Sequence, residues 1–428
     1  MKILILTNLF PPGFIGGYEL GAHELAVALH DLGHEIFVLT TDYLPNDPLR
    51  ETPFPVERSL IHHGLRHDLG RQNAFERDYY SFLNIRRIGA AHRRIRPDLV
   101  ISFNLHGLGA PAIFRYFAAV GTPLLPYFMD NFFPEGEDAQ FRTDRYVKLI
   151  TPHSEAPRFH AIAMSDNVSS QVRATKFLNL DKVTLVPGWI HSLIDFPTMT
   201  ERSNCPESNP SVRSRRRFIF CSRIAPHKGT LIVLDAAQSL IRRGVMDFSI
   251  DFYGQGQVAQ FLQEISRRGL SDFVCYRGTA NKSEIVTLFS HYDALLFPTW
   301  EREAFGFVAS EATGGGCIPI LTAAAGASEW LLDAYDCFKI QRDSASLAEA
   351  MAQILFMTDD ALSAMKRNAR ITAGEIFHFS KLVPRIAHVA NEIVENSSQG
   401  QIGDRHSRGV EAALLVLGSL AGEDGDSA

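Results

Sequence analysis

Cysteine is scarce in this sequence, and no two cysteines have the spacing of a metal or redox site. The chain of 428 residues has five, which are odd in number, scattered and never arranged as CxxC: Cys205, Cys221, Cys275, Cys317 and Cys337. A disulfide framework needs paired cysteines, and a structural zinc site needs closely spaced ones. The pattern therefore favours reduced thiols in a cytosol over a disulfide scaffold or a zinc site.

Long apolar runs and an excess of positive charge are also lacking. No uninterrupted apolar run approaches the roughly 20 residues of a membrane-spanning helix. The first segment, MKILILTNLF, stops at Pro11 and Pro12 without a small-residue cleavage site, so it is typical of a strand and not of a signal peptide. The formal net charge of -6 argues against nucleic acid as a partner. We therefore expect a soluble, cytoplasmic protein.

The first half of the chain repeats a strand, a loop and a helix. KILILTNLF is followed by a glycine loop with Gly16 and Gly17, a helical pattern and the strand EIFVLTT. Further apolar strands are predicted at 97–103, 122–128, 159–165 and 182–188, and parallel strands of this kind are joined by right-handed crossovers. Residues 41–75 show no period and are predicted to be an insertion or a flexible loop.

A polar, proline-containing stretch at 198–217 predicts a linker between two domains. Domain 1–197 comes before it, and the alternation of strands and helices restarts over 218–380. A terminal helix at 381–396, with a return to the first domain as one option, precedes a tail at 397–428. The predicted fold is α/β, with two doubly wound Rossmann-like domains that face a cleft. Ligands of such sheets bind at the carboxyl ends of the strands.

The segment EREAFGFVASEATGGGCIPI places seven residues between Glu303 and Glu311. Burying a carboxylate is costly unless it is bonded. A helix that begins near Phe305 would direct the amides of Gly306 and Phe307 at a ligand. Hydroxyl groups of a sugar and of a ribose would satisfy the two carboxylates, whereas a core ion pair explains one glutamate more easily than both.

Two other loops follow strands. In CSRIAPHKG, Arg223 and Lys228 suit a diphosphate, although solvated loop cations are the ordinary alternative. YGQGQVA, with Gly254, matches a GxGxxA dinucleotide fingerprint, but the next strand ends in Arg277 and not in an acidic residue, which disfavours an NAD-dependent dehydrogenase. Gly16 and Gly17 fit an anion-binding loop and a tight turn equally well.

Together these segments resemble the retaining family-4 glycosyltransferases, which have the GT-B fold and an E-x7-E motif. The resemblance implies that the first domain binds a glycan, polysaccharide or lipid-linked acceptor and the second a nucleotide-sugar donor. It implies that Arg223 and Lys228 hold the diphosphate and that Glu311 binds the ribose. Glu303, with the amides from Phe305 to Phe307, would contact the transferred sugar, and Gly254 would belong to the donor side.

The sequence departs from the family pattern on the acceptor side. Where the family often has His-Asp, PYFMDNFF has Met129 and Asp130, so Asp130 stays an acceptor-side candidate without its histidine neighbour. His106, in FNLHGLG, is a further candidate for the cleft, although a lone histidine is more often structural. The hinge segment 187–191 is also altered. The alternatives are a nucleotide-sugar epimerase and a non-catalytic nucleotide-sugar binding protein.

No DxD-type acidic pair occurs where a metal would bridge the phosphates, so we expect no cofactor and no metal. Residues 82–97, FLNIRRIGAAHRRIRP, mix apolar side chains with five arginines. Such a helix can lie on anionic lipid at the inner face of a membrane, and a solvated basic face over an apolar stripe is an equally good interpretation.

Overall fold

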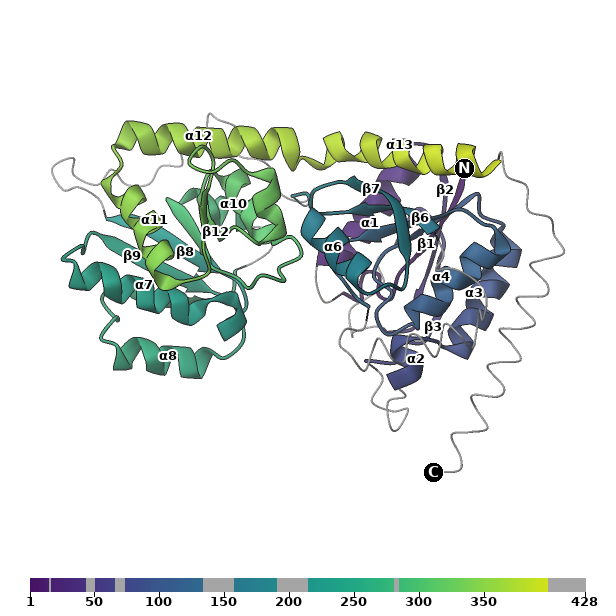
Figure 1. Ribbon diagram of the computed structural model, residues 1–428, viewed down its shortest axis with the longest axis horizontal. Coiled ribbons are helices and arrows are strands. Elements are labelled where there is room, and N and C mark those ends of the chain that lie inside the picture. Colours follow the sequence, from purple (N-terminus) through teal and green to yellow (C-terminus); the bar gives the residue numbers. More distant parts are fainter. Residues whose placement is uncertain are drawn as a thin grey trace, which may run out of the picture. The chain divides into compact units, whose positions relative to one another are not determined.

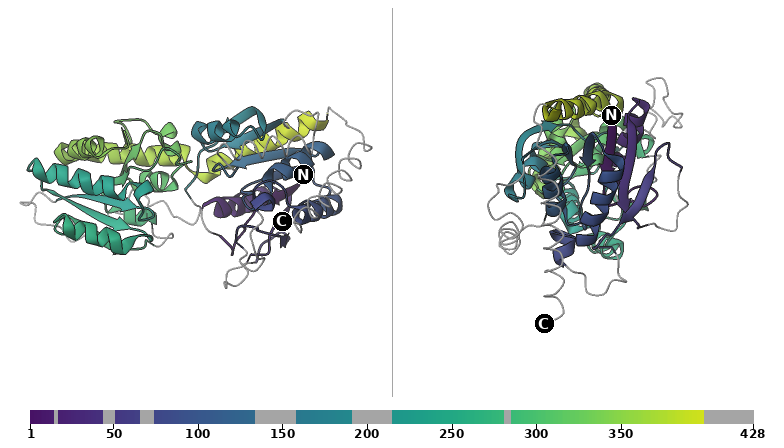
Figure 2. Two further views of the ribbon diagram at one scale, coloured as in Figure 1. Left: turned by 60° about the horizontal axis from the view of Figure 1, so that its bottom comes forward. Right: turned by 90° about the vertical axis from the view of Figure 1, so that its right-hand side faces the viewer.

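The protein divides into two units, each built on one parallel sheet. A computed structural model describes residues 1–14, 17–43, 51–65, 74–133, 158–190, 215–280 and 285–398. The first unit is Met1–Val186 together with the part of the last helix from Val383, and the second is Pro187–Leu382. In each unit the strands lie among helices that connect them (Figures 1 and 2). The predicted fold of two Rossmann-like α/β domains is confirmed.

The first unit contains a seven-stranded sheet in the order β3-β2-β1-β4-β5-β6-β7, and every pair is parallel. Its strands are β1 (Lys2–Leu6), β2 (Glu35–Thr41), β3 (Val56–Leu60), β4 (Leu99–Ser102), β5 (Leu124–Phe128), β6 (Arg158–Ala163) and β7 (Asn179–Leu185). Its helices are α1 (Gly17–Asp31), α2 (Ala74–Asp78), α3 (Phe82–Ile95), α4 (Ala110–Val120) and α6 (Asp166–Ala174). The strand order reverses between β1 and β4, which are neighbours.

The last helix, α13 (Phe379–Ser398), packs on the first unit. Lys182 on β7 donates to Glu392 on this helix at 2.6 Å. The first unit ends at Val186 and the second begins at Pro187, earlier than the expected ranges, and the part of the last helix from Val383 belongs to the first unit, which was one of the options expected for it.

The expectation of an insertion or flexible loop over residues 41–75 was wrong at Val56–Leu60. Val56–Leu60 form β3, which pairs in parallel with β2 from Val38↔Val56 onward. β3 is an edge strand, and most of its side chains are half-buried, so its sequence VERSL carries no apolar run. The guanidinium of Arg58 also ties the strand to the glycine loop, donating to the carbonyls of Phe10 at 3.1 Å and Pro11 at 2.6 Å.

The second unit contains a six-stranded sheet in the order β10-β9-β8-β11-β12-β13, again all parallel. Its strands are β8 (Arg216–Cys221), β9 (Phe248–Tyr253), β10 (Val274–Gly278), β11 (Ala294–Phe297), β12 (Ile318–Thr322) and β13 (Phe338–Ile340). Its helices are η1 (Pro226–Lys228), α7 (Thr230–Arg242), α8 (Val258–Arg267), α9 (Ile285–Ser290), α10 (Phe307–Gly315), η3 (Gly326–Trp330), α11 (Ser344–Phe356) and α12 (Asp359–Ile376). Figure 1 shows α7 and α8 on one side of this sheet and α12 on the other.

The second sheet begins inside the stretch predicted to be a linker. β8 starts at Arg216, whose amide donates to the carbonyl of Asp247 at 3.0 Å. The next arginine, Arg217, lies over the Tyr292 ring at 4.6 Å. Consecutive arginines resemble a solvated linker in the sequence, but here the backbone of one is in the ladder and the side chain of the other covers an aromatic ring.

The apolar stripe of the 82–97 segment faces the core. Ile85, Ile88 and Ile95 on α3 are at most 8% exposed, and α3 packs against β2, β3 and α4. The exposed face of the helix carries arginines, among them Arg86, Arg93 and Arg94. These isoleucines cannot face lipid, because they build the first unit's core. That part of the membrane interpretation is therefore wrong.

The described part of the chain has no disulfide and no helix long and apolar enough to cross a membrane. Its cysteines are all free thiols: Cys221, Cys275, Cys317 and Cys337. Cys205 lies outside the described residues.

Candidate active site

The strand order of the second sheet reverses between β8 and β11, and two predicted site residues lie there. Lys228 follows β8, and Glu303 follows β11. In a doubly wound sheet the carboxyl end at such a reversal is where ligands bind. The two loops touch at Gly229, where a Cβ atom would lie 2.2 Å from the Pro298 carbonyl oxygen. Glycine at this position, with φ +84°, therefore lets Lys228 approach the loop that carries Glu303.

Lys228 and Glu303 form an ion pair through Nζ and Oε2. The same carboxylate oxygen accepts from the Thr299 hydroxyl at 2.6 Å. The Thr299 carbonyl in turn accepts from Thr322 at 2.9 Å, which links the loop to β12. The side chains of Lys228 and Glu303 are only 18% and 15% exposed. These bonds offset the cost of partly burying Glu303.

Positive charge dominates around His227, the residue before Lys228. Burial lowers the pKa of His227, and the positive charges of Lys228, Arg223 and Arg342 lower it further. The negative charge of Glu303 has the opposite effect on this pKa. Arg342 also donates to the carbonyls of Pro226 and His227, both at 3.3 Å. Three cations therefore surround η1 with one carboxylate, and that balance suits a ligand with two or more negative charges.

Two glycines of the GxGxxA segment position the loop that carries Arg223. A Cβ at Gly254 would lie 1.9 Å from the Ser222 carbonyl oxygen, and one at Gly256 would lie 2.4 Å from that of Ile224. The Ile224 amide donates to Gln255 at 2.8 Å, and the Ile224 carbonyl accepts from Gln257 at 2.8 Å. These glycines allow two backbone segments to meet, so Gly254 supports the exposed Arg223 through its backbone. The structure gives no reason to assign them to a dinucleotide.

Helix α10 begins at Phe307, two residues after the predicted start. Gly306 precedes it with φ 90°, and a Cβ there would lie 2.6 Å from the Phe297 ring. Phe305 stays outside the helix, and its carbonyl accepts from Ala327 at 2.8 Å. The Phe305 ring is 1% exposed, and it packs so closely on the chain that a Cβ at Gly188 would lie 2.4 Å from it. Phe305 therefore fixes the start of α10 from the core, and its side chain is not available to a ligand.

Glu311 lies within α10 and is 5% exposed. Burial and the nearby Glu311 carboxylate raise the pKa of the Cys221 thiol to about 12. Because Cys221 is the last residue of β8, Glu311 lies near the carboxyl end of that strand. The glycines that follow serve packing: Gly316 ends the helix with φ 70°, and the Gly315 carbonyl accepts from Arg370 at 3.1 Å.

In the first unit, the start of α1 and the end of β5 are joined by Tyr18. Its hydroxyl donates to the Tyr127 carbonyl at 2.9 Å and accepts from the Met129 amide at 2.8 Å. Burial, and to a smaller extent Asp130, raises the pKa of Tyr18. The structure thus brings Gly17 and the exposed Asp130 to one end of this sheet. Gly16 lies outside the described residues.

His106 follows β4, at the reversal of the first sheet. Its ring is exposed, and its centroid lies 5.9 Å from that of His62, which is 3% exposed. His106 is therefore part of a histidine pair and not the lone histidine of the sequence interpretation.

Comparisons with known proteins agree with both units. Residues 15–191 match the family model Glycosyltransferase Family 4, and residues 202–372 match the model Glycosyl transferases group 1. The chain is a GT-B glycosyltransferase. A sequence search of curated proteins finds no match to this glycosyltransferase.

Solved structures share the fold of the glycosyltransferase at low identity. Sucrose-phosphate synthase from Thermosynechococcus elongatus has a TM-score of 0.69 at 16% identity, over 92% of this chain and 99% of that one. A glycosyltransferase from Rickettsia africae has a TM-score of 0.67 at 16% identity, with the same coverage. HepE from Anabaena, in complex with UDP and glucose, has a TM-score of 0.62 at 18% identity, over 92% of this chain and 100% of that one.

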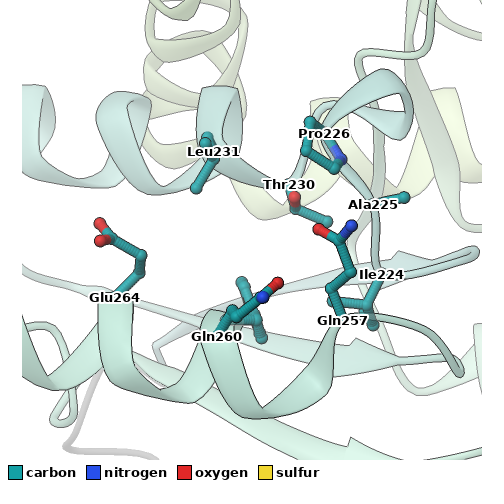
Figure 3. A pocket seen from close by; sticks show the side chains of 9 residues that line it. Ile224, Ala225, Pro226, Thr230, Leu231, Gln257, Gln260 and Glu264 are labelled. Carbon is teal, nitrogen blue, oxygen red and sulfur yellow. The ribbon is translucent and has the colours of Figure 1, made fainter.

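A pocket of about 200 Å³ lies between α7 and α8 of the glycosyltransferase, beside the segment Ile224–Pro226 (Figure 3). Gln257, the residue before α8, and Gln260 on α8 face Thr230 and Leu231 from α7 across it (Figure 3). None of the predicted site residues lines this pocket. It shares Pro226 of η1 with the element that carries Lys228.

Sequence reasoning missed several residues that hold the glycosyltransferase's predicted site together. Thr299 and Arg342 bond Glu303 and η1 as described, and no motif marks either residue. Tyr18, directly after the paired glycines, could have been noticed as an aromatic with a polar tip at a helix start. His62 lies in the stretch that shows no period, so nothing in the pattern singled it out.

Proposed function

We propose that this glycosyltransferase moves a sugar from a nucleotide-sugar donor to a hydroxyl acceptor, with retention of anomeric configuration and without a metal. The observation that carries the proposal is the Lys228–Glu303 ion pair at the strand-order reversal, within a cluster of three cations. A diphosphate supplies the negative charge that such a cluster can bind, and the transferred sugar supplies hydroxyl groups for Glu303.

In the proposed reaction, the bond between the anomeric carbon and the diphosphate oxygen breaks as the diphosphate leaves. Lys228, Arg223 and the start of α10 stabilise the negative charge that develops on it. The acceptor hydroxyl attacks from the same face, and its proton passes to the departing diphosphate oxygen. Glu303 contacts the transferred sugar, and Glu311 binds the ribose.

The acceptor is proposed to be a glycan, a polysaccharide or a lipid-linked precursor that binds the first unit, with Asp130 on its side. The HepE structure holds UDP and glucose, and related structures of HepE hold UDP alone or UDP-glucose. These names support a UDP-sugar as the first donor to test. Peripheral contact with anionic lipid is proposed to use the exposed arginines of α3, since its apolar stripe is buried.

Thermal unfolding with UDP, GDP, ADP and NAD in separate samples, without added metal, tests the donor site. One nucleoside diphosphate is expected to raise the Tm by several degrees, because a ligand at a hundred times its Kd stabilises the folded state by about 2.7 kcal/mol. A shift with NAD alone, or with none of the four ligands, would contradict the proposed donor site.

Turnover in a chelator tests the mechanism. The release of nucleoside diphosphate from the donor is the signal for turnover. We expect the rate in about 5 mM EDTA to equal the rate without EDTA, because the fixed cations replace a bridging metal ion. The product's anomeric proton, followed by NMR during the reaction, is expected to show the configuration of the donor. Loss of turnover that Mg²⁺ or Mn²⁺ restores would contradict metal independence, and an inverted product would contradict retention.

A further inference from the structure

The residues that line the pocket between α7 and α8 (Figure 3) take no part in the proposed reaction. The walls of this pocket are mostly apolar, and three uncharged polar side chains interrupt them: Thr230, Gln257 and Gln260. Small-molecule sites are typically built in this way, as an apolar hollow with a few placed polar groups. The volume of about 200 Å³ exceeds the roughly 150 Å³ of a cavity that takes up benzene, so one six-membered ring fits.

Thr230, the first residue of α7, is the buried polar residue of this pocket. It is 3% exposed, and its hydroxyl has no hydrogen bond within the described part of the chain. Buried hydroxyls are normally bonded, because an unbonded one costs free energy. α7 also begins after Gly229 without a side-chain cap, so its first amides have no partner within the helix. This wall therefore offers polar groups to a molecule from outside the chain.

The opposite wall supplies two carboxamides. Gln257 and Gln260 are exposed, and Figure 3 shows the Gln257 carboxamide extending toward Thr230. Neither carboxamide bonds another residue of the described ranges. Because a carboxamide both donates and accepts, the two side chains can bond neighbouring hydroxyl groups of one ligand.

The charges of the pocket favour an uncharged ligand. No lysine, arginine or histidine is among the residues that line it. Its one ionisable side chain, Glu264, accepts from Arg267 at 2.7 Å and from Arg268 at 2.9 Å, and these bonds lower the pKa of the carboxyl to about 2. A phosphate here would lie beside a carboxylate without a cation in the wall to bind it.

The apolar part of the pocket suits the carbon face of a sugar ring. Leu231 is 39% exposed at the wall, and the buried Phe261 is held against Phe252 with ring centroids 4.5 Å apart. A wholly apolar ligand would cover these side chains but leave Thr230 and both carboxamides unbonded. A saccharide ring has an apolar face and an edge of hydroxyl groups, so it satisfies both parts of the pocket.

We propose that the pocket between α7 and α8 binds one uncharged saccharide ring, whose hydroxyl groups bond Thr230, Gln257 and Gln260. This saccharide site is additional to the donor site proposed at Lys228 and Glu303. It does not depend on the reaction proposed there, so the two can fail separately.

The state of the Thr230 hydroxyl can be measured without any ligand. Thr230→Val removes the hydroxyl at nearly the same volume and is expected to keep or raise the wild-type Tm, because no hydrogen bond is lost. The matched control is Thr372→Val on α12, where the buried hydroxyl donates to Asp336 at 2.6 Å. Its Tm is expected to fall by roughly 2–4 °C. An equal fall in Thr230→Val would show that its hydroxyl is bonded within the chain, and would overturn the proposal.

Side-chain amide NMR of the full chain, labelled with ¹⁵N-glutamine, tests binding. The signals of Gln257 and Gln260 are assigned by their loss in the alanine variants, and Gln171, which bonds Asn167 in the first unit, is the reference. The probes are the methyl α-glycosides of glucose, galactose and mannose, and inorganic phosphate. We expect at least one glycoside to shift both pocket signals with a Kd of about 1–10 mM, the range for a ligand of one ring. No shift with any glycoside, or an equal shift with phosphate, would overturn the proposal.

Variants connect these shifts to the pocket. Thr230→Val and Gln260→Ala are each expected to raise the Kd of the glycoside roughly tenfold, which is the scale of one hydrogen bond. The matched control is Gln263→Ala, which replaces an exposed glutamine of α8 outside the pocket and should keep the wild-type Kd. An unchanged Kd in either pocket variant would overturn the proposal, so Gln260→Ala decides alone if Thr230→Val does not fold.

UDP distinguishes this pocket from the donor site. We expect the glycoside shifts to persist when UDP is saturating. Loss of the shifts would place the glycoside in the donor site and would overturn the proposal. A wild-type protein that does not respond to UDP would contradict the proposed function, and the glycoside titration would still decide whether the pocket binds a saccharide.

Discussion

Replacing Glu303 by glutamine is expected to lower sugar transfer at least a hundredfold while UDP binds more tightly. In the structure the Glu303 carboxylate pairs with Lys228. A diphosphate must compete with that carboxylate for the ammonium group, so its removal leaves more positive charge for the diphosphate. We expect the Kd of UDP to fall about tenfold, which corresponds to about 1.4 kcal/mol.

Transfer should fall because, in the proposed reaction, the same carboxylate contacts the sugar as positive charge develops at its anomeric carbon. Removing one preorganised group at a reacting centre commonly costs about 10² to 10³ in kcat. The two effects have opposite signs. A variant that had merely lost its fold would bind UDP less well. Tighter UDP binding together with slower transfer would therefore show that the variant is folded and that the loss of transfer is due to the missing carboxylate.

The matched control is Glu301→Gln, two residues earlier in the same loop, where the side chain is exposed. Isothermal titration with UDP and initial rates with UDP-glucose should leave this control within about twofold of wild type. Weaker UDP binding in Glu303→Gln, or transfer within tenfold of wild type, would count against the assigned role of Glu303.

Residues at the ends of buried strands were the predictable part of the site. Lys228 and Glu303 could be placed together because each follows an apolar strand, and parallel strands bring their carboxyl ends to one edge. Glu311 could be located because a helix repeats every 3.6 residues. These inferences need only local patterns and the rules of doubly wound sheets.

The residues that were missed depend on contacts between distant segments. Arg342 reaches η1 from more than a hundred residues away, and His62 meets Asn8 and His106 only because β3 joins the sheet at its edge. β3 itself was missed because an edge strand with half-buried side chains needs no apolar run. The burial of the Phe305 ring could not be predicted, because its partner, Gly188, belongs to a segment more than a hundred residues earlier.

Alanine at Gly254 is expected to cost about 3 kcal/mol of unfolding free energy or more, which is the largest stability effect of a single methyl group that we predict. Its Cβ would lie 1.9 Å from the Ser222 carbonyl oxygen, a backbone atom that cannot swing away, and its φ of +148° is unfavourable for alanine. Overpacking and backbone strain each cost about 1–3 kcal/mol. Denaturant unfolding measures the difference.

Gly244→Ala is the matched control for that measurement, because Gly244 also has a positive φ, +77°, but nothing lies within 4 Å of the added Cβ. The loss of unfolding free energy in the control should therefore come only from the unfavourable positive φ of alanine, about 1 kcal/mol. The remaining cost at Gly254 must be relieved by displacement of the Ser222–Ile224 backbone, which moves Arg223. We therefore expect Gly254→Ala to weaken UDP binding at temperatures where the variant is still folded, whereas Gly244→Ala leaves it unchanged. Equal stability losses in the two variants would show that close packing against β8 is not what requires glycine in this loop.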